Sequence, residues 1–83
     1  MDLLTKVETL LKREFSAPDD KIKLEENDGV YGYVISSRFK GMDTIDRLDI
    51  IWNILDSGLK PKERRNVLTI VAITPREAIA HSS

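Results

Sequence analysis

Apolar residues near the start of the chain recur at spacings of three and four positions. This period is typical of an amphipathic helix, so the pattern predicts a helix over residues 2–15. Asp2 is placed to cap its amino end, and Pro18 ends the pattern because proline disfavours helix in the residue before it. The apolar positions are Leu3, Leu4, Val7, Leu10, Leu11 and Phe15.

Two short runs of alternating residues follow and predict a β-hairpin. In the first run Ile22 and Leu24 alternate with charged neighbours, and the second run covers residues 30–37. The tripeptide Asn27-Asp28-Gly29 between them contains residues that tolerate a positive φ, as hairpin turns require. Gly32 inside the second run indicates either a bulge or close packing against a helix.

Helical periodicity returns after a loop over residues 38–42. Asp43 is placed as the N-cap, and Ser57-Gly58 followed by Pro61 ends the helical region. We expect Trp52 to pack mainly in the core, the alternative being partial exposure for a partner. The predicted apolar face consists of Ile45, Leu48, Ile51, Trp52, Leu55 and Leu59.

The last third of the chain predicts a strand and a short helix. A polar connector over residues 60–66 leads into the run Val67 to Ile73, which is apolar at nearly every position. Such a run is expected for a strand that is covered on both sides or lies centrally. Thr74-Pro75-Arg76-Glu77 then forms a capping box, which starts a helix, and residues 81–83 are expected to fray.

The order of predicted elements is α-β-β-α(α)-β-α. The connection through the central helix is long enough for a right-handed parallel crossover, and the hairpin supplies an antiparallel pair. We therefore predict an α+β fold, a three-stranded mixed sheet with helices on one face. At 83 residues the chain fits a single domain over residues 1–83.

Composition narrows the possible functions. The net charge is −1 and 33% of the residues are charged in both signs, which does not suit a dedicated nucleic-acid binder. The chain has no cysteine, so it has neither a disulfide nor a thiolate nucleophile or ligand. Its longest apolar stretch is far shorter than a membrane helix needs, and its acidic start does not fit a secretory signal. We expect a cytoplasmic protein.

No arrangement of residues points to catalysis. The sequence shows no Ser/His/acid set and no cofactor loop, and its four glycines form neither a dinucleotide nor a P-loop pattern. His81 is the single histidine and is expected to be a solvated tail residue. We therefore predict a protein that is not an enzyme and that has no metal site or cofactor.

Two segments resemble the landmarks of the BolA-like proteins. Residues 35–47 read ISSRFKGMDTIDR, which is similar to the family's strand ending in Ser, then Arg-Phe-x-Gly, then a helix with an acid–Arg pair. Thr74-Pro75-x-Glu77 after the last strand matches the second landmark at a fitting distance. The resemblance covers nearly the whole chain and implies a fold similar to the type II KH domain.

The departures from the family pattern concern its metal ligands. BolA-like proteins usually carry histidines at the positions of Leu48 and Val71, and many carry a cysteine or histidine in the loop that here is residues 26–29. Those family residues are associated with sharing an iron–sulfur cluster with monothiol glutaredoxins. Such a cluster needs thiolate or imidazole donors, so the cluster role does not carry over to this chain.

Basic residues form two groups that a parallel sheet would place at opposite ends. Where both parallel strands finish, cations would gather beside helix N-termini, which favour an anion or a nucleic-acid phosphate. Nearby carboxylates at 43, 46 and 77 partly cancel this field, the KH Gly-x-x-Gly clamp is absent, and an ordinary solvated surface is the alternative. The first group is Arg38, Lys40, Arg47 and Arg76, and the second is Lys60, Lys62, Arg64 and Arg65.

These observations lead to one hypothesis of function and its alternatives. The first is a non-enzymatic, BolA-like regulatory or stress-associated protein that contacts nucleic acid, since the resemblance implies a link to transcriptional regulation. The second is an adaptor that pairs with a monothiol glutaredoxin or with itself through the central-helix face, without metal ligands of its own. A scaffold with neither activity is the third.

Overall fold

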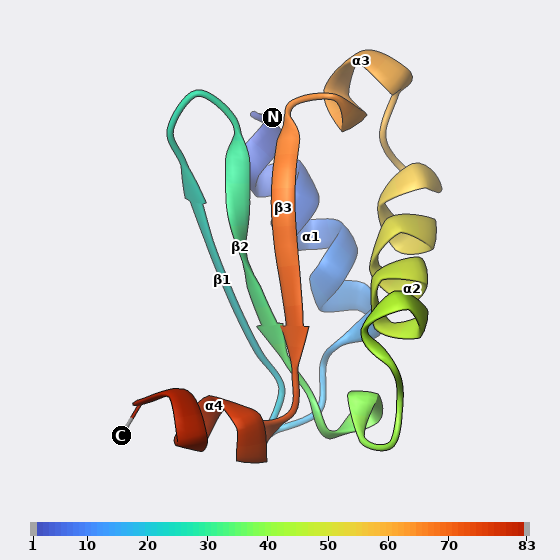
Figure 1. The fold of residues 1–83 in the computed structure, drawn as a ribbon. Coiled ribbons are helices and arrows are strands. Elements are labelled where there is room, and N and C mark those ends of the chain that lie inside the picture. Colours follow the sequence, from blue (N-terminus) through green and yellow to red (C-terminus); the bar gives the residue numbers. More distant parts are fainter. Residues whose placement is uncertain (1, 83) are drawn as a thin grey trace.

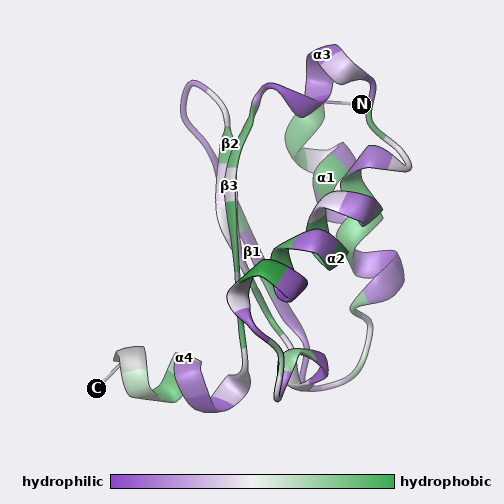
Figure 2. Ribbon diagram, turned by 45° about the vertical axis from the view of Figure 1, so that its right-hand side comes forward, coloured by the Kyte–Doolittle hydropathy of each residue, from purple (hydrophilic) through white to green (hydrophobic). Residues whose placement is uncertain are grey.

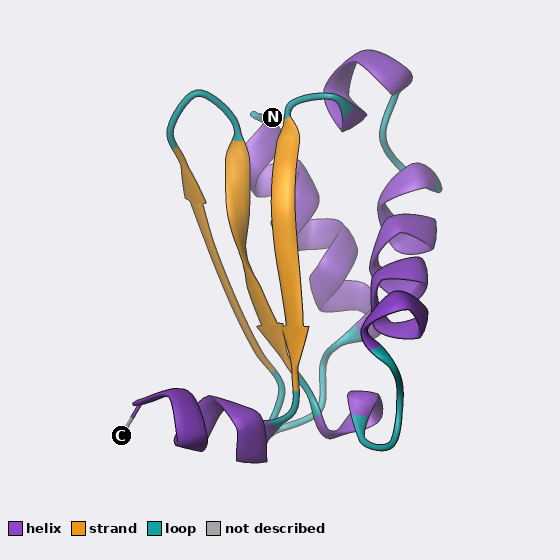
Figure 3. Cartoon of the chain, in the orientation of Figure 1, coloured by secondary structure: helices purple, strands orange, loops and turns teal. Residues whose placement is uncertain are grey.

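A three-stranded sheet with helices beside it forms the protein, and the structure, a computed structural model, describes residues 2–82 (Figure 1). Helices and strands alternate along the chain much as the periodicity predicts (Figure 3). The elements are α1 (Leu3–Glu14), β1 (Lys21–Glu26), β2 (Val30–Ile35), the 3-10 turn η1 (Ser37–Phe39), α2 (Thr44–Asp56), α3 (Pro61–Arg64), β3 (Val67–Ile73) and α4 (Pro75–Ser82).

The sheet confirms the predicted fold class. Its order is β1-β2-β3, with β1 antiparallel to β2 and β2 parallel to β3. The prediction that the last strand is central or covered on both sides is wrong, because β3 lies at the edge and Val71 is 48% exposed. The run is apolar on both sides, yet α1 and α2 cover only one of them, and α4 borders the other side only at one end (Figure 2).

The hairpin and its glycine show two different backbone requirements. Asp28 and Gly29 have φ values of 58° and 142°, which confirms the predicted positive-φ turn. At Gly32 a Cβ would overlap the carbonyl oxygen of Lys23 and lie 2.8 Å from the Cα of Leu24. The glycine therefore allows a close approach to β1 rather than to a helix, and the sheet's irregular register lies instead at Val30/Tyr31 against β3.

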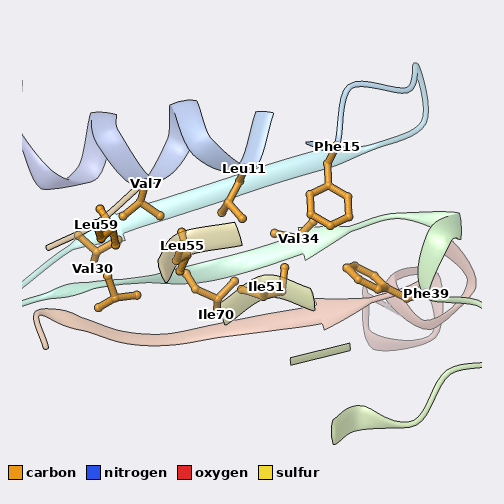
Figure 4. Packing of buried hydrophobic residues seen from close by; sticks show 11 residues of the cluster. Val7, Leu11, Phe15, Val30, Val34, Phe39, Ile51, Leu55, Leu59 and Ile70 are labelled. Atoms are coloured by element: carbon orange, nitrogen blue, oxygen red, sulfur yellow. The ribbon is translucent and has the colours of Figure 1, made fainter. Parts of the chain in front are cut away.

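Helices α1 and α2 pack on one side of the sheet and enclose the core (Figures 2 and 4). The second strand ends at Ile35, so the prediction of strand at residues 36–37 is wrong. The Ser36 hydroxyl accepts a hydrogen bond from the Arg38 N–H and starts η1, which brings the Phe39 ring to 5.3 Å from that of Phe15. The buried core consists of Val7, Leu11, Phe15, Val30, Val34, Phe39, Ile51, Leu55, Leu59, Val67 and Ile70.

The inward face of α2 is rotated from the predicted one. Ile45 is 73% exposed, whereas Ile50 and Ile54 pack against the core. The reason is that Arg47 takes the inward position of the first turn, three residues before Ile50, so Ile45 points away. Trp52 is partly buried against the core, as the main expectation for that side chain has it, and its use by a partner stays a prediction.

The two ends of the sheet carry short helices. The polar connector before β3 contains the short helix α3, where the Glu63 carboxylate accepts from the Lys60 N–H at 2.9 Å. Helix α4 starts at the predicted capping box and extends to the side of the sheet opposite α1 and α2 (Figure 2). Its backbone stays helical to Ser82, beyond the predicted fraying point, while the side chain of His81 lies outside the described part. No helix within residues 2–82 is both long and apolar enough to cross a bilayer.

Candidate functional site

The structure places the two groups of basic residues at opposite ends of the sheet, as the sequence predicts. Strands β2 and β3 are parallel, so η1 and α4 both follow their carboxyl ends, while α3 precedes β3 at the other end (Figure 1). The four predicted anion-binding residues therefore belong to one end of the molecule. Their surroundings differ greatly.

Arg47 is turned into the protein rather than toward solvent. Its side chain is only 12% exposed, and its Nη1 donates to the Glu77 carboxylate at 2.6 Å and to the Ala72 carbonyl at 3.3 Å. Its Nε donates to the Met42 carbonyl at 2.9 Å. The guanidinium thus links α2, β3 and α4, and the geometry gives it a structural role.

The same contact joins the two sequence landmarks. Glu77 accepts from Arg47 and also from the Thr74 N–H at 2.7 Å, while the Thr74 hydroxyl accepts from the Glu77 N–H at 3.2 Å. The Arg47 hydrogen bond, followed by the Thr74 N–H, lowers the pKa of Glu77 from 4.5 to about 2. Arg47 of one landmark and the Thr74 and Glu77 of the other therefore meet in a single network that joins α2 to α4.

Arg38 is also engaged, although less completely. Its guanidinium lies 5.1 Å from the centre of the Phe15 ring, its Nη1 donates to the Glu14 carbonyl at 3.4 Å, and the Glu14 carboxylate is 3.9 Å away. The side chain is 47% exposed. A nearby acid and a stacked ring leave it a weaker anion contact than its sequence position suggests.

Lys40 and Arg76 are the cations of this end that face solvent. Both are exposed, and neither forms an ion pair among the described residues. Asp43 and Asp46 at the start of α2 are exposed as well, and Asp43 occupies the predicted N-cap position without a side-chain hydrogen bond. These two exposed cations and two exposed acids leave this end of the molecule with little net charge from its unpaired residues.

The second basic group is divided in a similar way. The Arg64 guanidinium stacks 3.8 Å from the centre of the Trp52 ring and donates to Asp56 at 3.0 Å. Glu63 pairs with Lys6 at 2.8 Å, and this hydrogen bond is the main cause of its lowered pKa. The remaining members, Lys60, Lys62 and Arg65, are exposed.

The side of the sheet away from α1 and α2, which we call the open face, is a surface that the sequence reasoning missed. Its side chains come from alternate positions of each strand, and α4 forms a wall at one end. Together they line a groove of about 1120 Å³. From β1 through β2 to β3 its three rungs are Lys21–Ile35–Ile73, Lys23–Tyr33–Val71 and Glu25–Tyr31–Thr69, and the wall consists of Pro75, Ala78 and Ile79.

The chemistry of the open face suits a protein partner better than a polyanion. Lys21 and Lys23 are matched in number by Asp19 and Glu25, so the groove carries no net charge. A hydrogen bond to Glu25 raises the pKa of the Tyr31 hydroxyl. Tyrosines among aliphatic residues, with few charges, are characteristic of the core of protein–protein contacts.

A signal for this face was present in the sequence. Apolar residues at both odd and even positions of 30–35 and 67–73 predict two apolar sides of one sheet. Periodicity alone does not say whether the second side is covered by the same chain. The prediction that the same chain covers both sides of this strand is wrong, because the second side is exposed.

Comparison with known proteins defines the class of fold first: a small α+β domain with a mixed three-stranded sheet, of the kind found in BolA-like proteins. No protein-family model and no curated protein matches the sequence. Among solved structures, BolA1 from Arabidopsis thaliana is 21% identical with a TM-score of 0.64 over 93% of this chain and 96% of that one. A Bol-like protein from Babesia bovis is 20% identical with a TM-score of 0.66, over 100% and 96%.

A third similar structure is the BolA domain of SufE1 from Arabidopsis thaliana. It is 17% identical with a TM-score of 0.65, over 93% of this chain and 96% of that one. These likenesses confirm the BolA-like fold that the sequence resemblance implies.

The residues at the family's two histidine positions do not fit an iron–sulfur cluster. Leu48, at one position where the family carries histidine, is a half-buried residue of α2, and Val71, at the other, lies on the open face. Neither has a donor atom for iron. Among the side chains that the structure describes, no group of three or more His, Cys, Asp or Glu is arranged to hold a metal ion.

Proposed function

We propose that this protein is a non-enzymatic, BolA-like binding protein whose open face holds a protein partner. This is the adaptor hypothesis, with the contact moved from the central helix to the sheet. A regulatory or stress-associated role, which the family resemblance implies, would then be exerted through that partner.

The observation that carries the proposal is the position of Val71. It stands where BolA-like proteins usually carry the histidine of the last strand, and it is 48% exposed in the middle of the open face. A histidine there would point to a partner, whereas a valine among Tyr33, Ile35 and Ile73 supplies apolar contact. The BolA domain of SufE1 supports the same use, since in that protein the fold is one domain of a larger chain.

The test is a titration of the isotope-labelled protein with a monothiol glutaredoxin, followed by amide chemical shifts. We expect shifts to gather on Tyr31, Tyr33, Val71 and α4. The variant Val71→Asp should weaken binding by about tenfold or more, because a carboxylate in an apolar contact loses its hydration. Ile45→Asp is the matched control, since Ile45 is 73% exposed on α2, outside the open face. Shifts confined to α2 would contradict the proposal.

A second candidate function, contact with nucleic acid, is favoured by the exposure of Lys40 and Arg76 at one end of the sheet. Two phosphate contacts predict a weak interaction whose log K falls with log salt at a slope of about −2. The double variant Lys40→Ser/Arg76→Ser should abolish binding of a DNA duplex or an RNA strand at 50 mM salt. Its control is Lys62→Ser/Arg65→Ser at the opposite end. Binding that resists salt, or that only the control removes, would contradict this candidate.

A further inference from the structure

Three of the four charged residues that line the open face lie in one line along β1, and two of them, Lys23 and Glu25, are placed so that they can pair with a second copy. Lys21 and Lys23 come first, at the end of the face nearest α4, and Glu25 follows toward the hairpin. A second copy turned by 180° presents this line in reverse. A two-fold axis can therefore bring a base of one copy against an acid of the other, as self-complementary interfaces require.

The position of such an axis follows from the register of the sheet. With the axis level with Leu24, between two rungs, Lys23 of each copy faces Glu25 of the other. The same axis sets Tyr33 over the second copy's Tyr31, because those tyrosines lie on the same two rungs. On β3 the half-exposed Val71 meets Thr69 of the other copy. No like charges face each other in this arrangement.

The wall of the groove fits the same geometry. Helix α4 rises at the end of the sheet from which Lys21 starts, on the side of the open face (Figure 2). A reversed second copy ends there with its hairpin. Ile79 is 70% exposed. In the dimer it would be covered by the hairpin of the other copy.

We propose that the open face is the contact surface for a second copy of this chain, packed face to face about this two-fold axis. The inference rests on the proposed function, because it names a partner for the same face. Two observations favour a second copy over a polyanion: the groove has no net charge, and its Lys23 and Glu25 are placed to pair with each other across a two-fold axis.

The small size of the contact indicates a weak dimer. Strands about 4.8 Å apart and residues about 3.3 Å long give a sheet of roughly 300 Å² on each copy, to which α4 adds. Stable complexes bury about 800 Å² per partner, so this dimer is a weak one that should form at about 0.1–1 mM.

Sedimentation equilibrium and amide shifts recorded on dilution from 1 mM test the inference. In the wild-type protein we expect concentration-dependent shifts on β1, β2 and α4. Lys23→Glu or Glu25→Lys alone should weaken association by about tenfold, because like charges then face each other. The double variant Lys23→Glu/Glu25→Lys should restore it, since the exchanged charges again meet opposites.

The outcomes separate this inference from the proposed function. A wild-type chain that stays monomeric at 1 mM, or a double variant as weak as the single ones, overturns the dimer. If the glutaredoxin titration still shifts the amides of the open face, the proposed function stands without the dimer. If neither the glutaredoxin nor a second copy shifts them, both proposals fail. Ile45→Asp, which should associate like the wild type, controls for a general effect of added charge.

Discussion

Two neighbouring residues of β3, Ile70 and Val71, face opposite sides of the same sheet and have opposite surroundings. Ile70 is 1% exposed among the core residues under α1 and α2, and Val71 is 48% exposed in the groove of the open face. Both are β-branched aliphatic residues in one apolar run. The comparison shows that a strand can be apolar on both sides when one side builds the domain and the other is left for a partner.

The largest expected effect separates these two positions directly. Ile70→Ala should lower the free energy of unfolding by about 2–5 kcal/mol, because it removes buried methyl groups and leaves a cavity. Val71→Ala removes partly exposed atoms and should cost less than about 1 kcal/mol. Urea unfolding followed by circular dichroism at micromolar protein measures both. Equal losses at that concentration would mean that the open face is covered within a single chain.

The close approach of β1 to β2 at Gly32 gives the next prediction. A Cβ there would overlap the Lys23 carbonyl oxygen, which is backbone and cannot rotate away. Gly32→Ala should therefore lower the free energy of unfolding by about 1–3 kcal/mol, as other overpacked positions do.

Gly41→Ala is a poor control for this variant, because Gly41 has a φ of 77°. Ala72→Gly on β3 instead measures the general effect of glycine in a strand. A Gly32→Ala variant of wild-type stability would contradict the close approach.

The helices and strands were predictable because their signals are local. The hairpin follows from Asn27-Asp28-Gly29, whose last two residues adopt positive φ, and α4 follows from the capping box of Thr74 and Glu77. The parallel crossover follows from the length of the connection between β2 and β3. Each of these needs only residues close in sequence or the general rules of chain geometry.

The site was harder to predict because its determinants are distant in sequence. Its sequence position groups Arg47 with the anion-binding cations. Only the fold shows that Arg47 is paired with Glu77, a residue thirty positions further along the chain. The burial of Phe39 was missed because a loop residue has no period to indicate a face. The open face was missed because the sequence of β3 specifies two apolar sides without saying what covers the second.

A smaller effect is expected at the residue that connects the two sides of the sheet. Arg47 reaches from α2, on the covered side, to Glu77 of α4 beside the open face. Arg47→Met should cost about 1–2 kcal/mol, because the carbonyls of Met42 and Ala72 lose a charged donor. It should also increase amide exchange in α4.

The control for this variant is Lys6→Met. Lys6 pairs with Glu63 at 2.8 Å but is 33% exposed, so its loss should cost less than about 1 kcal/mol and leave α4 unchanged. Equal losses from the two variants, or unchanged exchange in α4 of the Arg47 variant, would contradict the linking role.

The smallest effect concerns acid. Glu77 has a pKa of about 2 in the folded protein, against an ordinary value of 4.5, because Arg47 and the Thr74 N–H donate to its carboxylate. The unfolded chain therefore takes up this proton first as the pH falls. The stabilisation by the pair is complete above about pH 4.5 and is lost between there and pH 2.

Glu77→Gln removes this titration, so its unfolding free energy should fall less steeply with acid over that range than that of the wild type. Glu8→Gln, at a carboxylate of α1 that pairs with Lys12 at 3.2 Å, removes one negative charge away from this network and controls for the change in net charge. Amide exchange adds a second measurement, since protonating Glu77 should release α4 while Ile70 and its neighbours stay protected. If α4 and the core lose protection together, the wall of the open face is as firmly held as the covered side, and the distinction between the two faces is one of exposure alone.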